Sequence, residues 1–221
     1  MTPSARERRS LLLARVHAAT GIVPLGAFLV LHVWSQSRAI QGPLAYERVV
    51  RKTQSIPGVL LLEGVGIYLP LLFHAAYGIL LSVRSGSGPA RPERPKAWSR
   101  PMQRLTGVLT LLFVGYHLWE LPVARILGRL RGSDLFPSLV DSLSSTTSLG
   151  VPLGAVAYLV GLASSAYHFA NGLSGFLLDF GLVTSERTGR LASVACTMFG
   201  TLVFLVGAST VFYYATGSPW P

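Results

Sequence analysis

Residues 57–83 read PGVLLLEGVGIYLPLLFHAAYGILLSV, an almost uninterrupted apolar run. About 20 mostly apolar residues are enough for a helix to cross the hydrocarbon core of a bilayer. This run exceeds that length and holds one acidic residue, Glu63, and one histidine, His74. Because an ionisable side chain inside a span is costly, its presence indicates function. The stretch therefore predicts a membrane-crossing helix that carries a functional histidine.

Further apolar runs of similar length lie at roughly 12–37, 105–128, 150–178 and 190–215. The chain is 50% hydrophobic and 13% charged, which agrees with an integral membrane protein. The longest polar stretches, a basic loop from Arg84 to Arg104 and a turn-rich region from Arg129 to Ser148, leave no room for a soluble domain. The predicted fold is one all-α transmembrane domain over residues 1–221: five helices, of which the first four form a bundle and the fifth packs alongside.

Basic residues predict the orientation. With the N-terminus inside, the inner segments would hold twelve of the nineteen lysines and arginines, which favours an inside N-terminus and an outside C-terminus. The basic start Arg6–Arg9 resembles a signal peptide, but the apolar run that follows is too long for one. The net charge of +10 is better explained by anionic lipid and a docking partner than by nucleic acid.

Four histidines fall into two matched pairs inside the spans. His32 and His117 each begin the pattern H-x-W, while His74 and His168 each begin H-x-A-x-G. His32 follows Thr20-Gly21 much as His117 follows Thr106-Gly107, so these two share a depth near the outer face. His74 and His168 lie near the inner ends of their helices. We call His32/His117 the outer pair and His74/His168 the inner pair.

A neutral imidazole binds haem iron through one ring nitrogen, and two axial imidazoles favour electron transfer over oxygen binding. The two pairs therefore predict two bis-histidine b haems stacked across the membrane. A proton-relay transporter without haem is the alternative, but such transporters are built from broken helices or inverted repeats, which this chain does not suggest. Zinc is disfavoured because no helix carries two ligands at metal-site spacing.

Several other residues are left with two interpretations. His17 has no twin and is excluded from the axial set; it is a candidate for a haem propionate contact or for simple packing. Gly78 and Gly172, four residues after the inner histidines, favour either room for a flat macrocycle or a close helix contact. Glu63, Gln36 and Glu120 are quinone-site candidates that are equally compatible with structural or interfacial roles.

The chain resembles a known family over nearly its whole length: the five-helix, two-haem cytochrome b membrane anchor subunits of succinate dehydrogenase and fumarate reductase. The resemblance is carried by Arg15–Gly21 and Pro24 to His32, Leu62-Glu63 through Leu69-Pro70 to His74–Gly78, Gln103–Gly107 to His117–Glu120, and His168–Leu173. Each piece alone is weak, whereas the combination is specific.

The resemblance implies that the inner pair holds a higher-potential haem and the outer pair a lower-potential one. It also implies an inner-face flavoprotein that oxidises succinate, with FAD, and an iron-sulfur protein that passes electrons to the inner haem. The Arg84–Arg104 loop would help to dock them. Electrons would then reach menaquinone near the outer face of a prokaryotic inner membrane.

Fumarate-reducing relatives with a compensating proton path can carry a glutamate two residues before the last histidine. Here that residue is Ala166, which favours the dehydrogenase direction. The competing hypothesis is an anchor for another membrane dehydrogenase, of the hydrogenase or formate dehydrogenase type. One ligand on each of four helices argues against the cytochrome bc type, in which each haem-bearing helix carries two.

Overall fold

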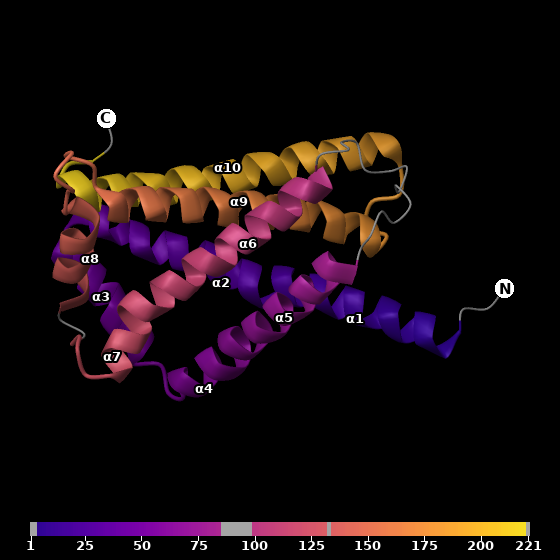
Figure 1. Cartoon of the computed structure of the whole chain (residues 1–221), viewed down its shortest axis with the longest axis horizontal. Coiled ribbons are helices and arrows are strands. Elements are labelled where there is room, and N and C mark those ends of the chain that lie inside the picture. Colours follow the sequence, from indigo (N-terminus) through magenta and orange to yellow (C-terminus); the bar gives the residue numbers. More distant parts are fainter. Residues whose placement is uncertain (1–3, 85–98, 132–133, 220–221) are drawn as a thin grey trace.

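The computed structural model describes residues 4–84, 99–131 and 134–219, and every regular element in these ranges is a helix. Five helical segments are long and apolar enough to cross a membrane: Ala5–Gln41, Val59–Val83, Ser99–Ile126, Leu153–Asp179 and Glu186–Thr216. The predicted fold class is therefore confirmed. The chain crosses the bundle so that its two ends lie at opposite poles (Figure 1). We call these poles the N-terminal end and the C-terminal end.

The first span is divided into α1 (Ala5–Ile22) and α2 (Pro24–Gln36). It begins earlier than the apolar run predicted because Ser4 and Glu7 form a capping box, in which each side chain satisfies the other's backbone amide. The break falls at Pro24, which has no N–H to donate to the preceding turn. The short 3-10 helix η1 (Ser37–Gln41) ends the span.

The second and third spans each contain a π-helical turn toward the C-terminal end. The second consists of α4 (Val59–Glu63), the π-helix η2 (Gly64–Tyr68) and α5 (Leu69–Arg84). The third consists of α6 (Ser99–Leu118), the π-helix η3 (Trp119–Val123) and α7 (Ala124–Ile126). Pro70 follows η2 and Pro122 lies within η3, and a proline removes the i→i−4 bond that a regular turn requires.

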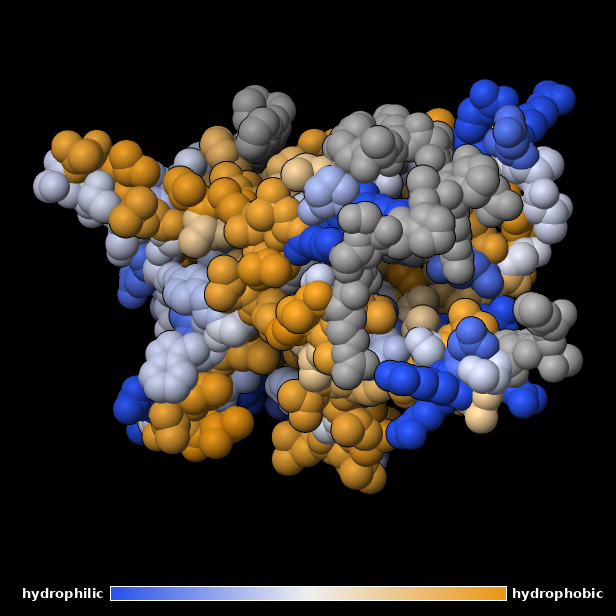
Figure 2. Space-filling model, turned by 45° about the vertical axis from the view of Figure 1, so that its right-hand side comes forward, coloured by the Kyte–Doolittle hydropathy of each residue, from blue (hydrophilic) through white to orange (hydrophobic). Residues whose placement is uncertain are grey.

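The two longest helices lie along one side of the bundle (Figure 1). Helices α9 (Leu153–Asp179) and α10 (Glu186–Thr216) run side by side, and α9 also packs against α6 and α1 (Figure 1). The outer flanks of the helices are apolar: Leu60, Leu112 and Met198 are each more than 60% exposed. Hydrophobic side chains cover much of the face in Figure 2. A bilayer accounts for surfaces of this kind.

Two amphipathic helices pack at the C-terminal end, α3 (Pro43–Gln54) and α8 (Leu135–Ser144). Leu135, Leu139 and Leu143, spaced four residues apart, are buried in a cluster that includes Tyr46 and Tyr214. The interpretation of Arg129–Ser148 as a turn-rich region was therefore wrong for half of its length, because this leucine spacing gives a short helix one buried face. Most of the basic loop Arg84–Arg104 lies outside the described residues.

Helices α9 and α10 approach each other closely at Gly200. A Cβ atom there would lie 2.6 Å from the Ala170 Cβ and 2.9 Å from the Ala166 carbonyl oxygen. We expect Gly200→Ala to lower the free energy of unfolding by about 1–3 kcal/mol, because overpacking forces the helices apart. The measurement is thermal or denaturant unfolding in detergent. Gly189→Ala is the matched control in α10, since its nearest neighbours would be 3.8 Å away; a similar loss in both variants would contradict the prediction.

Candidate functional site

The inner pair lies between α5 and α9. The rings of His74 and His168 face each other with centroids 6.1 Å apart and planes at 88°. Each Nδ1 points to a main-chain carbonyl, at 3.0 Å from His17 for His74 and 3.1 Å from Gln103 for His168. Because a carbonyl only accepts, both Nδ1 atoms must carry the hydrogen. Each Nε2 then carries a lone pair, the form in which an imidazole binds a metal. The Nε2 of His168 also lies 3.4 Å from the Gln103 side-chain amide nitrogen.

The carbonyls that hold the inner pair come from equivalent positions in two helices. His17 precedes Thr20-Gly21 in α1, just as Gln103 precedes Thr106-Gly107 in α6. A Cβ on Gly21 would collide with the His74 ring, and one on Gly107 would lie 3.0 Å from the His168 ring. The repeated Thr-Gly dipeptide is thus explained by the structure: its glycine leaves space for an imidazole of the neighbouring helix.

The glycines of the H-x-A-x-G motif also have equivalent neighbours. A Cβ on Gly78 would lie 3.1 Å from the His17 ring, and one on Gly172 would lie 3.5 Å from the Gln103 side-chain nitrogen. Both glycines therefore lie where two helices come close together. The sequence left two roles open for these glycines, room for a flat macrocycle or a close helix contact. The distances in the structure support the close helix contact.

His17 itself lies against the inner pair. Its ring stacks on that of His74 with centroids 4.1 Å apart and planes at 10°. Its buried Nδ1 has no hydrogen-bond partner within the described part of the chain. His17 thus supports His74 through its carbonyl and its ring, and it does not face His168 across the gap that the inner pair encloses.

The outer pair lies between α2 and α6, with ring centroids 5.8 Å apart and planes at 75°. Here the partner of a ring nitrogen is a side chain: His117 Nδ1 lies 3.1 Å from the hydroxyl of Tyr158 in α9. That hydroxyl donates to Glu120 Oε2 at 2.7 Å. Tyr158 was not predicted as a functional residue, because a tyrosine in a span is ordinarily taken for an interfacial anchor.

Glu120 lies at the edge of a cavity. Its carboxyl group accepts hydrogen bonds from three hydroxyls, those of Tyr116, Tyr158 and Ser142. The cavity, of about 270 Å³, opens near the C-terminal end and is lined by Tyr116, Trp119, Glu120, Val123, Ala124, Leu127 and Arg129. Of the quinone-site candidates, Glu120 lines this cavity.

The structure places the other two quinone-site candidates elsewhere. Gln36 ends α2 and lies next to the phenol of Tyr46 in α3. Tyr46 is outside the spans, and burial raises the pKa of its hydroxyl although the Gln36 side chain acts in the opposite direction. Glu63 ends α4, half-buried, immediately before the π-helical turn.

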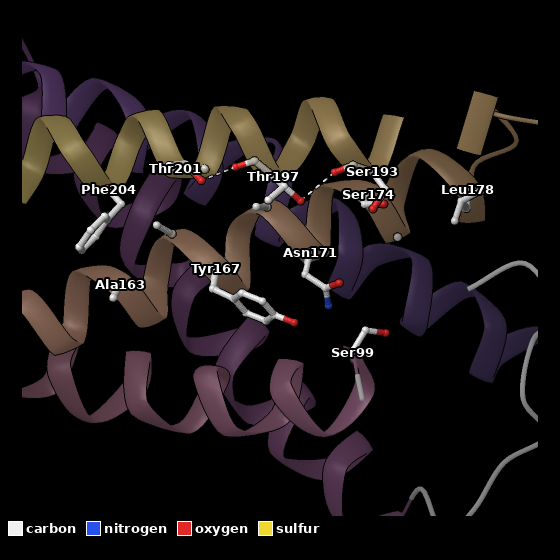
Figure 3. Close-up of a pocket in the computed structure, with 14 residues that line it drawn as sticks. Ser99, Ala163, Tyr167, Asn171, Ser174, Leu178, Ser193, Thr197, Thr201 and Phe204 are labelled. Atoms are coloured by element: carbon white, nitrogen blue, oxygen red, sulfur yellow. Dashed lines mark hydrogen bonds between the residues drawn. The ribbon is translucent and has the colours of Figure 1, made fainter. Parts of the chain in front are cut away.

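A second cavity, of about 340 Å³, lies between α9, α10 and the start of α6 (Figure 3). Its wall includes Tyr167, Asn171, Ser193, Thr197 and Thr201. The two threonine hydroxyls donate to carbonyls one turn earlier in α10. The Asn171 amide donates to the Gln103 side chain at 2.7 Å, so it belongs to the surroundings of His168.

The two histidine pairs fit haem iron. An iron atom held by two imidazoles, with bonds of about 2.0 Å, separates the ring centroids by roughly 6 Å. The observed separations are 5.8 and 6.1 Å. Among the described residues, no group of three or more His, Cys, Asp or Glu side chains is placed to hold a metal ion, so a closed zinc site of the usual kind has no ligand set there.

Five apolar spans define a multi-pass helical membrane protein, and two half-buried imidazole pairs lie between its helices. Residues 90–208 match the family described as the succinate dehydrogenase/fumarate reductase transmembrane subunit, and the chain belongs to this family. It is 29% identical over 206 residues to the succinate dehydrogenase cytochrome b558 subunit of Bacillus subtilis (strain 168). The aligned region covers 93% of this chain and 98% of the relative. No solved structure gives a significant match.

Proposed function

We propose that this chain anchors a succinate dehydrogenase in the membrane and carries electrons through two b haems to menaquinone. The main support is the spacing of the two histidine pairs. In each pair the two imidazole rings are far enough apart to hold one iron atom between them. The name of the Bacillus subtilis relative, a cytochrome b subunit, supports haem as the occupant. His74 and His168 would hold the inner haem, and His32 and His117 the outer one.

When bound, such haems would supply one-electron transfer. The chain's own residues prepare these sites. The carbonyls of His17 and Gln103 keep Nδ1 of the inner histidines protonated and thereby leave the lone pair on Nε2, the atom that would hold the iron. Gly21 and Gly107 leave the space in which the rings take this orientation.

The quinone would bind at the C-terminal end, in the cavity beside Glu120. Quinone reduction takes up protons as well as electrons, so its site needs a group that exchanges protons. Glu120 lines the cavity wall, and Arg129 is also part of the lining. The volume of about 270 Å³ is close to the lower end of typical ligand pockets, which begin at about 300 Å³.

The partners would bind at the N-terminal end, which the arginine and lysine bias assigns to the cytoplasm. An iron-sulfur subunit there would deliver electrons to the inner haem, and a flavoprotein subunit would oxidise succinate. Ala166, two residues before His168, favours succinate oxidation as the working direction. Family membership favours this assignment over an anchor of the hydrogenase or formate dehydrogenase type or a haem-free transporter.

The first test is a dithionite-reduced minus oxidised spectrum of the purified complex, with pyridine haemochrome stoichiometry. We expect two low-spin b haems per chain, because each imidazole pair provides one complete axial ligand set. A folded preparation without haem would contradict the proposal. One haem per chain would restrict the proposal to a single histidine pair.

A further inference from the structure

The two histidine pairs differ in what holds their ring nitrogens. In the inner pair, both Nδ1 atoms donate to main-chain carbonyls, which are neutral. In the outer pair, His117 Nδ1 meets the Tyr158 hydroxyl, which in turn meets the carboxyl group of Glu120. Only the outer pair is therefore connected to an acidic group through this series of hydrogen bonds, as far as the described residues show.

The geometry determines the direction of each hydrogen bond in this series. The single hydroxyl proton of Tyr158 points to Glu120 Oε2 at 2.7 Å, so its oxygen must accept from His117. His117 Nδ1 is then the donor, at 3.1 Å, and its Nε2 is the free atom. Nδ1–H, Tyr158 O–H and Glu120 carboxylate thus form a relay of two consecutive hydrogen bonds.

The relay is held in place by several elements. Tyr158 is 8% exposed in the core at the C-terminal end, with Leu139 and Leu143 of α8 in the same cluster. Ser142 of α8 and Tyr116 of α6 donate to the other carboxyl oxygen of Glu120. The carboxyl group thus receives three hydroxyl donors, an arrangement that suits a carboxylate, which only accepts. Glu120 also faces the cavity, where Arg129 is the other charged residue of the lining.

We propose that Tyr158 and Glu120 are positioning residues that lower the reduction potential of the outer haem by acting through His117. The inference rests on the proposed function, because it requires a haem on His117. A carboxylate that accepts, through a hydroxyl, the proton of a metal-bound imidazole makes the imidazole a more basic ligand. A more basic ligand stabilises ferric over ferrous iron and so lowers the potential.

The relay also gives a cause, in named residues, for a difference in reduction potential between the two haems. The inner histidines donate to neutral carbonyls, and no carboxyl group in the described part of the chain is joined to them in this way. The outer haem is thus the weaker oxidant of the two. Because Glu120 also borders the cavity, a molecule bound there by hydrogen bonds to the carboxylate would alter the outer haem and leave the inner one unaffected.

The test is a potentiometric titration of both haems in the intact, quinone-depleted complex, comparing Tyr158→Phe with Tyr116→Phe. Both substitutions remove one hydroxyl donor from Glu120, but only Tyr158 reaches His117. We expect Tyr158→Phe to raise the reduction potential of the outer haem. The equilibrium constant for its reduction should increase about tenfold, which corresponds to about 59 mV. Tyr116→Phe should change that equilibrium less than about twofold, and the inner haem should be unchanged in both.

Equal shifts in the two variants, no shift, or a lower outer potential in Tyr158→Phe would overturn the proposal. If Tyr158→Phe loses the outer haem, Glu120→Gln decides, because it removes the charge and keeps Tyr158. That variant should also raise the outer potential, and an unchanged value would overturn the proposal. Wild-type complex without haem would instead refute the proposed function, so the two failures are distinguishable.

Discussion

Replacing His168 with alanine is expected to remove the inner haem and leave one b haem per chain. His168 supplies one of the two rings in the inner gap, and the remaining ring, His74, cannot complete a bis-imidazole site. Even supporting residues of metal sites typically cost about 10–100-fold on mutation, so loss of a ligand should lower succinate-dependent quinone reduction by more than about 100-fold. The measurements are pyridine haemochrome stoichiometry and quinone reduction by membranes. Assembly with the partner subunits should also weaken, because the haem that would link α5 to α9 is lost.

The matched control is His17→Gln, which replaces a histidine beside the same gap. Gln103 occupies the equivalent position in α6, so glutamine suits this environment, and the substitution keeps the carbonyl that binds His74. This variant should retain two haems. Two haems in His168→Ala would contradict the assignment of His74 and His168 as the ligands. Loss of the inner haem in His17→Gln would contradict the expectation that the His17 carbonyl alone is enough to hold His74.

Hydropathy and motif spacing were enough to predict the spans and the facing histidines. Apolar runs long enough for a bilayer identify helices regardless of how these pack. Equal depth then follows from counting residues along each helix, and this placed His32 beside His117 and His74 beside His168 before any contact was known. The position of a span and the depth of a histidine can be predicted because each depends on the sequence of one helix alone.

Residues whose role depends on a neighbouring helix were harder to predict. Tyr158 joins His117 to Glu120 only because α9 packs against α6, and no motif marks it. Gly78 had two interpretations because its spacing from His74 does not reveal that His17 faces it. Helix α8 is different, since its leucines at every fourth position were a detectable signal in a short, serine-rich segment.

Replacing His32 with alanine is expected to remove the outer haem and leave the inner one in place. This substitution separates ligation from the relay, because Tyr158 and Glu120 contact His117. Succinate should still reduce the remaining haem, since the inner pair at the N-terminal end is intact. Quinone reduction should fall by more than about 100-fold, because a metal ligand has been lost and the route to the cavity beside Glu120 loses its second carrier. The measurements are haem stoichiometry, the succinate-reduced spectrum and quinone reduction.

His117→Ala provides the comparison for His32→Ala. The two rings lie 5.8 Å apart across one gap, so removing either should give the same single haem with the same inner-haem potential. Different haems lost in the two variants would contradict the pairing. If succinate failed to reduce the remaining haem, the proposed order of electron transfer would be wrong, because the inner haem would not be the first acceptor. Rapid quinone reduction without the outer haem would instead place the quinone near the inner pair, away from the cavity that Glu120 lines.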